Sequence, residues 1–349
     1  MFWKGRMFVA AATISFNLVC GGEVLPRPND VTNRPVLDVS ADERSIAWVA
    51  PADYLRSNLV ILDNRLRQQQ ILDLGTANVE AISWGADDMS LMVALEDGTL
   101  RFYRRNPSDG RLEEDRALDL NGWKGVHGVE NAGVWYIAVL SNRGSLDSGI
   151  VKIKRGESRG QQIYFHEDNV VERTAPIKRI YTSGSGSIAK IVLVTMSAIH
   201  FLNPDGTKAD PEIWAGPKNV HFFDGVGKSD QELVACSNHK GCRVIPFSDR
   251  GAAGHFSIGK EIVLDVAVNS DRVALLVHGN NHLYLYNRRQ GGQQIETCVS
   301  PEKGRAIGMI NEAILVGSPD GSLRAFTHQS FGRVSGENKC VVRYSYTPD

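Results

Sequence analysis

The sequence predicts an all-β fold assembled from repeated four-stranded units, and three observations support this prediction. Helical periodicity is hard to find after residue 30. Short apolar runs recur instead, each bounded by Gly, Asn, Asp, Ser or Pro, which is the pattern of strands separated by turns. Two of these runs surround nearly the same turn, LEDGTLRFY at 95–103 and SPDGSLRAF at 318–326, and they start 223 residues apart.

The apolar runs follow a fixed order that defines the unit. In one window the order is VEAISW, SLMVAL, TLRFYRR and RALDL, with the second run the most apolar. Four strands per unit, with the second strand buried, is the pattern of a β-propeller blade. Asp97-Gly98 and Asp320-Gly321 suit the hairpin between the second and third strands, because glycine tolerates positive φ and aspartate hydrogen-bonds the local backbone.

The spacing of the units predicts their number. Val36 and Ala306 are 270 residues apart, so six steps between them average 45 residues, which matches blades of about 40–45 residues. The two similar turns then lie five units apart. We therefore predict a single seven-bladed β-propeller of four-stranded antiparallel blades over residues 36–349, with six or eight blades as alternatives. The predicted units begin near Val36, Val79, Trp123, Ile177, Val220, Ile262 and Ala306.

Two segments could close the predicted propeller. The run CVVRYSYT at 340–347 suits the outer strand of the last unit. Alternatively, the segment at 31–38 could add to that unit from the N-terminal side. The sequence leaves both arrangements open.

The N-terminus resembles an export signal. Lys4 and Arg6 precede a mostly apolar run from Met7 to Cys20, which is shorter than the roughly 20 residues needed to span a bilayer. Small residues place cleavage after Gly22, so we expect a signal peptide at 1–22, a linker at 23–35 and a periplasmic or secreted protein. Lipidation at Cys20, an uncleaved anchor that associates the chain with a membrane, and a mitochondrial presequence are alternatives. No later segment is long and apolar enough to cross a membrane, so no transmembrane segment is expected in the mature chain.

Cysteine usage agrees with export. Removing residues 1–22 leaves four cysteines, which allow three disulfide connectivities. Cys236 and Cys242 flank the turn SNHKG and could close a disulfide across a hairpin. A zinc site that uses His239 would have only three ligands where four are normal. The candidate disulfide residues are Cys236, Cys242, Cys298 and Cys340.

Charge and motif searches argue against several function classes. The net charge is −1, so no global field attracts nucleic acid, and no nucleic-acid partner is expected. The G-x-S-x-G, P-loop and HExxH patterns do not occur in the sequence. A sialidase-type Asp-box is incomplete at 145–152, where Lys152 replaces the aromatic residue. We therefore expect no catalytic residues, no cofactor and no metal.

The histidines keep one enzymatic alternative open. His278 and His282 flank a turn but show no third ligand. His127 and His166 could line the central channel of a propeller. A lactonase-like hydrolase would draw its metal ligands from different blades and show no motif, so this is the alternative function.

Two loops between second and third strands exceed the length of a hairpin turn, at 50–57 and 141–148. Excess loop length on a rigid scaffold is a hint of binding. Trp and Lys at 123–124 enter the third unit and should share the face of these loops. The candidate binding residues are Tyr54, Arg56, Trp123, Lys124, Arg143 and Asp147.

The segments AISWGADDMSLMVALEDGTLRFY (81–103) and AILVGSPDGSLRAF (313–326) resemble WD40-type repeats. The usual Gly-His and Trp-Asp pairs are missing, and Phe102-Tyr103 and Ala325-Phe326 stand in the Trp-Asp place. The chain is therefore similar to degenerate WD40 propellers or bacterial extracytoplasmic propellers. The resemblance implies a scaffold that binds a protein or peptide partner within a larger assembly, without implying an activity.

Overall fold

The structure is a computed structural model. The chain divides into two compact units, Met1–Val31 and Thr32–Asp349, and every residue described below belongs to the second unit. The structure describes residues 36–49, 58–141, 148–155, 157, 161–163, 177–183, 189–195, 198–214, 222–228, 232–237, 241–247, 254–256, 263–269, 272–277, 282–287, 293–299, 304–310, 313–334 and 337–347.

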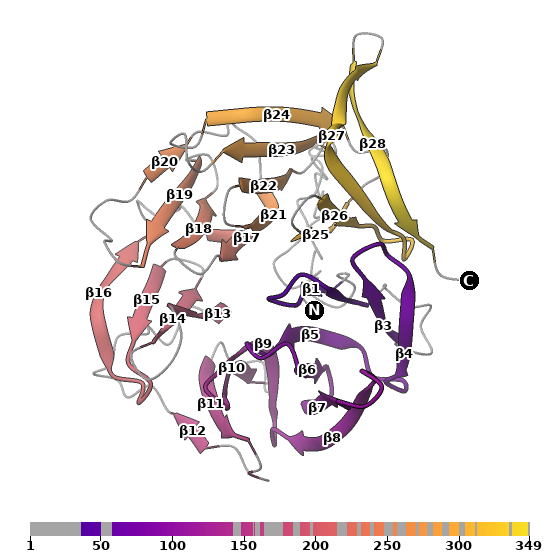
Figure 1. Cartoon of the computed structure of the whole chain (residues 1–349). Helices are drawn as coiled ribbons and strands as arrows, with labels where there is room; N and C mark the ends of the chain where they lie inside the picture. The colour runs from indigo at the N-terminus through magenta and orange to yellow at the C-terminus, as the bar shows by residue number, and fades with distance from the viewer. Residues whose placement is uncertain are drawn as a thin grey trace, which may run out of the picture. The chain divides into compact units, whose positions relative to one another are not determined.

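All secondary structure in these residues is β, and the strands fall into four-stranded groups of consecutive strands (Figure 1). The first three groups are β1 (Val36–Val39), β2 (Ser45–Val49), β3 (Asn58–Asp63) and β4 (Gln68–Asp73); β5 (Val79–Trp84), β6 (Ser90–Leu95), β7 (Thr99–Arg105) and β8 (Leu112–Asp119); and β9 (Trp123–Asn131), β10 (Val134–Ser141), β11 (Ser148–Lys154) and β12 (Gln161–Ile163).

The next groups repeat this order along the chain. They are β13 (Ile177–Ser183), β14 (Lys190–Thr195), β15 (Ala198–Leu202) and β16 (Lys208–Trp214); β17 (Phe222–Lys228), β18 (Glu232–Ser237), β19 (Gly241–Pro246) and β20 (Gly254–Phe256); β21 (Val263–Val268), β22 (Arg272–Val277), β23 (His282–Asn287) and β24 (Gln293–Val299); and β25 (Ala306–Ile310), β26 (Ala313–Gly317), β27 (Leu323–Val334) and β28 (Glu337–Tyr346).

Each group is an antiparallel meander, in which each strand after the first pairs with the strand before it. The last two groups are joined into one eight-stranded sheet by a single parallel pair, Val299 of β24 with Lys339 of β28. β28 itself pairs antiparallel with β27, so it is the outer strand of the last group. Val36–Val39 pairs with β2 in the first group.

The first strands of consecutive groups contact one another. Contacts run from β1 to β5, from there to β9, β13, β17, β21 and β25, and β25 in turn contacts β1. The chain's first and last groups share no strand pairing among the described residues, so they meet through side chains.

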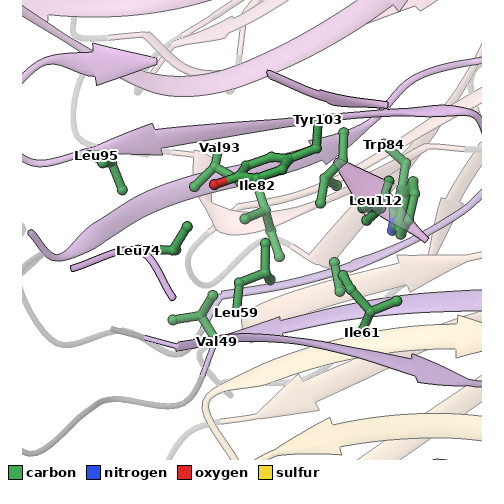
Figure 2. Packing of buried hydrophobic residues seen from close by; sticks show 12 residues of the cluster. Val49, Leu59, Ile61, Leu74, Ile82, Trp84, Val93, Leu95, Tyr103 and Leu112 are labelled. Atoms are coloured by element: carbon green, nitrogen blue, oxygen red, sulfur yellow. The ribbon is translucent and has the colours of Figure 1, made fainter. Parts of the chain in front are cut away.

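Buried clusters fill the spaces between neighbouring groups. In Figure 2, Val49, Leu59 and Ile61 of the first group pack toward Ile82 and Val93 of the second. Similar clusters join each later pair of consecutive groups. Because one four-stranded group is too thin to bury both of its faces, each group depends on both neighbours for its core.

Burial follows the order predicted from the sequence. Every residue of β6 is buried, whereas the outer strand β4 alternates between exposed and partly buried residues. Second strands lie between two apolar interfaces, and outer strands face solvent on at least one side. This difference explains why the second run of each unit is the most apolar.

The two similar turns have the same structure. Gly98 and Gly321 have φ of 91° and 87°, a region that favours glycine. Asp97 Oδ1 accepts a hydrogen bond from the Thr99 backbone N–H at 2.8 Å, and Asp320 Oδ1 accepts one from Ser322 N–H at 2.9 Å. These aspartates therefore serve as turn residues.

A tryptophan packs at the contact between the last group and the first, which we call the seam. Trp48 of β2 is fully buried, and its indole N–H donates to the Gly321 carbonyl at 3.0 Å. A Cβ at Gly317 would lie 2.3 Å from the Trp48 ring, so only glycine fits there. Gly308 of β25 likewise makes room for Leu37 of β1.

We expect Trp48→Phe to lower the free energy of unfolding by about 2–3 kcal/mol, because it removes buried volume and leaves the Gly321 carbonyl without its donor. Urea unfolding followed by fluorescence measures the change. Trp84→Phe is the matched control, because Trp84 is also buried but its indole N–H has no acceptor. An equal or larger loss for Trp84→Phe would contradict this account of the seam.

Candidate functional site

The predicted binding residues are only partly within the described residues. Tyr54, Arg56, Arg143 and Asp147 lie outside them. Trp123 and Lys124 open β9, and both are partly buried. Trp123 pairs with Ser141, the last residue of β10, so the loop that follows leaves its sheet beside Trp123.

Lys124 forms an ion pair that sequence reasoning missed. Its Nζ lies 3.0 Å from Oε1 of Glu80, which belongs to β5 of the preceding group. The Glu80 side chain is only 3% exposed and that of Lys124 is 24% exposed. Glu80 sits at a register shift between Val79 and Ala81, and such bulges redirect side chains. This pair joins the start of β9 to β5 of the preceding group.

The second oxygen of this carboxylate, Glu80 Oε2, is buried and has no hydrogen-bond partner. A buried charged acceptor that lacks a donor costs free energy. Lys124 is the charged group paired with this carboxylate, so its ammonium offsets the cost of burying Glu80.

We expect Lys124→Met to destabilise the protein by about 1–3 kcal/mol at pH 7, because it leaves the Glu80 carboxylate buried without a counter-ion. Chemical unfolding measures the loss. The double variant Glu80→Gln/Lys124→Met should recover most of it, since the uncompensated charge is then gone. If the double variant is as unstable as the single one, the pair does not stabilise this interface.

A second set of polar side chains lies on the first strands. Asp38 Oδ2 on β1 accepts a hydrogen bond from the Trp84 backbone N–H of the next group at 2.7 Å. Asp265 Oδ2 on β21 accepts one from Ile307 N–H, again in the next group, at 3.0 Å. Both aspartates sit in the tetrapeptide Val-Leu-Asp-Val, at 36–39 and 263–266. The repeated tetrapeptide is a sequence signal from which this contact could have been predicted.

On other first strands, serine and histidine side chains accept the equivalent hydrogen bond from a backbone N–H of the next group. Ser83 Oγ accepts from the Gly128 backbone N–H at 3.2 Å. His127 Nδ1 accepts from the Ile180 backbone N–H at 3.5 Å. His127, one of the histidines considered for a central channel, thus has a structural role in joining β9 to β13.

Five residues on first strands form what we call the inner-strand cluster: Asp38, His127, Arg179, Tyr181 and Asp265. The rings of His127 and Tyr181 meet edge to face, with centroids 5.3 Å apart. Arg179 and Tyr181 come from β13. The charges of Arg179, Asp265 and Asp38 act electrostatically on the Tyr181 hydroxyl. The cluster therefore draws its side chains from the first strands of four groups.

Burial dominates the electrostatics of this cluster. Desolvation raises the pKa of Asp38 to about 7, although hydrogen bonds from the Trp84 and Val39 N–H groups and the Arg179 charge oppose the shift. Asp38 itself keeps some accessible surface. Desolvation likewise raises the pKa of Tyr181.

Metal-ligating residues do not gather in the part of the chain that the structure describes: no group of three His, Cys, Asp or Glu side chains there could hold a metal ion. His166, His239 and His278 lie outside this part, and the His282 side chain is also outside it.

The disulfide expected from the sequence is present. Cys236 of β18 and Cys242 of β19 are bonded, and they face each other in the register of the hairpin. Cys298 lies in β24 and Cys340 in β28, but their side chains fall outside the described part of the structure.

We expect the Cys236→Ala/Cys242→Ala variant to lose about 2 kcal/mol of unfolding free energy, the entropic value for a cross-link that closes a short loop. Urea unfolding of oxidised wild type and of the variant gives the difference, and reduced wild type is the matched control. A non-reducing peptide map that shows two free thiols in the native protein would contradict the disulfide.

Comparisons with known proteins show the fold. No protein-family model matches the sequence, and no curated protein sequence matches it. The β-propeller domain of Cps50 (Swd1) from Myceliophteria thermophila is similar with a TM-score of 0.65 and 12% identity, over 84% of this chain and 97% of that chain. A chain of a mitotic checkpoint complex is similar with a TM-score of 0.64 and 12% identity, over 93% of this chain and 99% of that chain.

The chain has a WD40-like β-propeller fold. The resemblance read from 81–103 and 313–326 is confirmed at the level of the fold, since the similar structures are WD40 propellers. Within the described residues, none of the secondary structure is a helix that could cross a membrane.

Proposed function

We propose that this protein is a non-catalytic scaffold that binds a protein or peptide partner as part of a larger assembly. The observation that carries the proposal is the position of Trp123 and Lys124. Both lie at the strand end from which the loop 142–147 departs, and both keep exposed surface. Tryptophan is enriched among the residues that dominate binding energy at protein interfaces.

The arrangement of the strands supports a common binding face. The loop 50–57 follows β2 at the end where Val49 pairs with Val36. The loop 142–147 follows β10 at the end where Ser141 pairs with Trp123. In a propeller, the starts of the first strands share one face, so we propose that Tyr54, Arg56, Arg143 and Asp147 gather there with Trp123.

We further propose that the propeller has seven blades and closes without a shared sheet. The contact between β1 and β25 and the cluster that joins Trp48 to Leu315 and Leu323 support this closure. In most propellers a terminal strand pairs into the last blade. Here the four strands of each group are consecutive, so side-chain packing would carry the whole closure.

We also propose export, with removal of residues 1–22 and a periplasmic or secreted location. The Cys236–Cys242 disulfide supports this, because such bonds persist mainly in oxidising compartments. The fold supports partner binding in general terms: one similar chain belongs to a mitotic checkpoint complex, so a propeller of this shape works there in an assembly. An extracytoplasmic bacterial propeller would combine both features.

We expect Trp123→Ala and Lys124→Gln each to weaken partner binding about 10-fold or more, the size of a central interface residue. The full chain with a C-terminal tag is purified from its host, partners are identified by cross-linking and mass spectrometry, and affinity is measured with the purified partner. Circular dichroism checks that the variants fold.

Arg65→Gln is the matched control. Arg65 is exposed in the turn after β3, at the opposite end of its sheet from loop 50–57, so binding should be unchanged. Equal binding by wild type, Trp123→Ala and Lys124→Gln would overturn the proposed face. Recovery of the exported chain with Glu23 as its first residue would support cleavage, and recovery with Met1 would contradict it.

A further inference from the structure

One turn of the structure carries a residue pair that occurs nowhere else in the chain. Asn121-Gly122 is the only place in the sequence where glycine follows asparagine. The pair lies between β8, which ends at Asp119, and β9, which begins at Trp123. Both residues are exposed, and their φ angles of 50° and 92° lie in the left-handed region. The pair therefore forms a solvated bend between two strands.

The backbone amide of Gly122 is not engaged in this bend. Within the described residues its N–H donates no hydrogen bond, and the pairing of β9 with β10 begins one residue later, at Trp123. Glycine also has no Cβ that would keep this nitrogen away from the preceding side chain. The Gly122 nitrogen is therefore exposed and unhindered directly after the Asn121 side-chain amide.

Asn64 shows how a second exposed asparagine differs. It lies in the turn after β3 and is followed by Arg65, whose backbone N–H donates to Asp63 Oδ1 at 2.8 Å. This hydrogen bond occupies the amide nitrogen, and Arg65 also carries a Cβ beside it. The two asparagines share their exposure, but only Asn121 is followed by an unengaged glycine amide.

We propose that Asn121-Gly122 is a site of spontaneous deamidation. The Gly122 nitrogen gives its proton to a solvent base and attacks the Asn121 Cγ, which closes a five-membered imide ring. The Cγ–Nδ2 bond breaks, and Nδ2 takes up a proton and leaves as ammonia. Water then opens the ring: cleavage at Cγ yields aspartate, and cleavage at the main-chain carbonyl yields isoaspartate. No oxidant or reductant is consumed.

Either product changes the turn. The new carboxylate adds one negative charge to a chain of net charge −1, and isoaspartate also lengthens the main chain by a methylene group. The preceding residue, Leu120, is buried and donates its N–H to the Gly98 carbonyl at 3.1 Å, so the change occurs beside a fixed point of the fold. The turn directly precedes Trp123 and Lys124, but the reaction does not require the binding function proposed above.

Asp119 restrains the reaction in the folded chain. Its Oδ1 accepts a hydrogen bond from the Asn121 N–H at 2.7 Å, and its carbonyl accepts one from Asn121 Nδ2 at 3.3 Å. The second contact must break before the Asn121 side chain can rotate toward the Gly122 nitrogen. The native turn should therefore react more slowly than an isolated peptide, and Asp119→Ala should react faster than wild type because the first contact no longer fixes the turn.

A time course at mildly alkaline pH tests the site. The full chain is incubated in water enriched in the heavy oxygen isotope and is then denatured and digested with trypsin in ordinary water. The peptide 117–124, ALDLNGWK, contains one asparagine and no glutamine, so its mass reports Asn121 directly. Heavy oxygen in the product shows that hydrolysis preceded digestion. We expect aspartate and isoaspartate at position 121 and no conversion of Asn64, the matched internal control in peptide 57–65.

Two variants sharpen the test. Asn121→Gln should lose the reaction, because its longer side chain does not close the five-membered ring readily. If that variant does not fold, Asp119→Ala, checked by circular dichroism, still tests the turn and should convert faster than wild type. The proposal is overturned by equal conversion of Asn64. It also fails if folded wild type shows no conversion over several times the period in which synthetic peptide 117–124 converts completely. An unchanged or slower rate in Asp119→Ala would overturn the restraint assigned to Asp119.

Discussion

Each four-stranded group has two apolar faces, and only its neighbours can cover them. This constraint organises the described structure. The second strands are buried because they lie between two interfaces, and every large cluster joins two consecutive groups. No group could keep its core alone, since removing a neighbour would return an entire face to water.

At the contact between the last and first groups, packed side chains cover the apolar faces of both groups. Trp48 fills the space between β2 and β26, and glycines at 308 and 317 remove the atoms that would prevent the approach. The indole N–H is satisfied by a backbone carbonyl of the turn at Gly321. One buried tryptophan and two glycines thus allow the last and first groups to pack closely at this contact.

Polar side chains also connect neighbouring groups, in addition to the apolar clusters. Asp38, Ser83 and Asp265 tie first strands together through backbone N–H groups. Arg105 of β7 donates to Ser45 of the preceding group, and Arg155, which directly follows β11, pairs with Asp87 of the group before its own. These bonds matter because a buried donor or acceptor without a partner is costly.

Local patterns along the chain were sufficient to predict the repeat. The spacing of apolar runs placed the first strands of the units at Val36, Val79, Trp123, Ile177 and Ala306, where β1, β5, β9, β13 and β25 begin, because strand and turn patterns are local properties. The turns at Asp97-Gly98 and Asp320-Gly321 and the Cys236–Cys242 pair were likewise local. Three contacts depend instead on the three-dimensional packing: Glu80 with Lys124, Trp48 with Gly321, and Asp38 with the Trp84 backbone N–H. These partners come from different groups, and their contacts depend on how the groups pack, which no local pattern records.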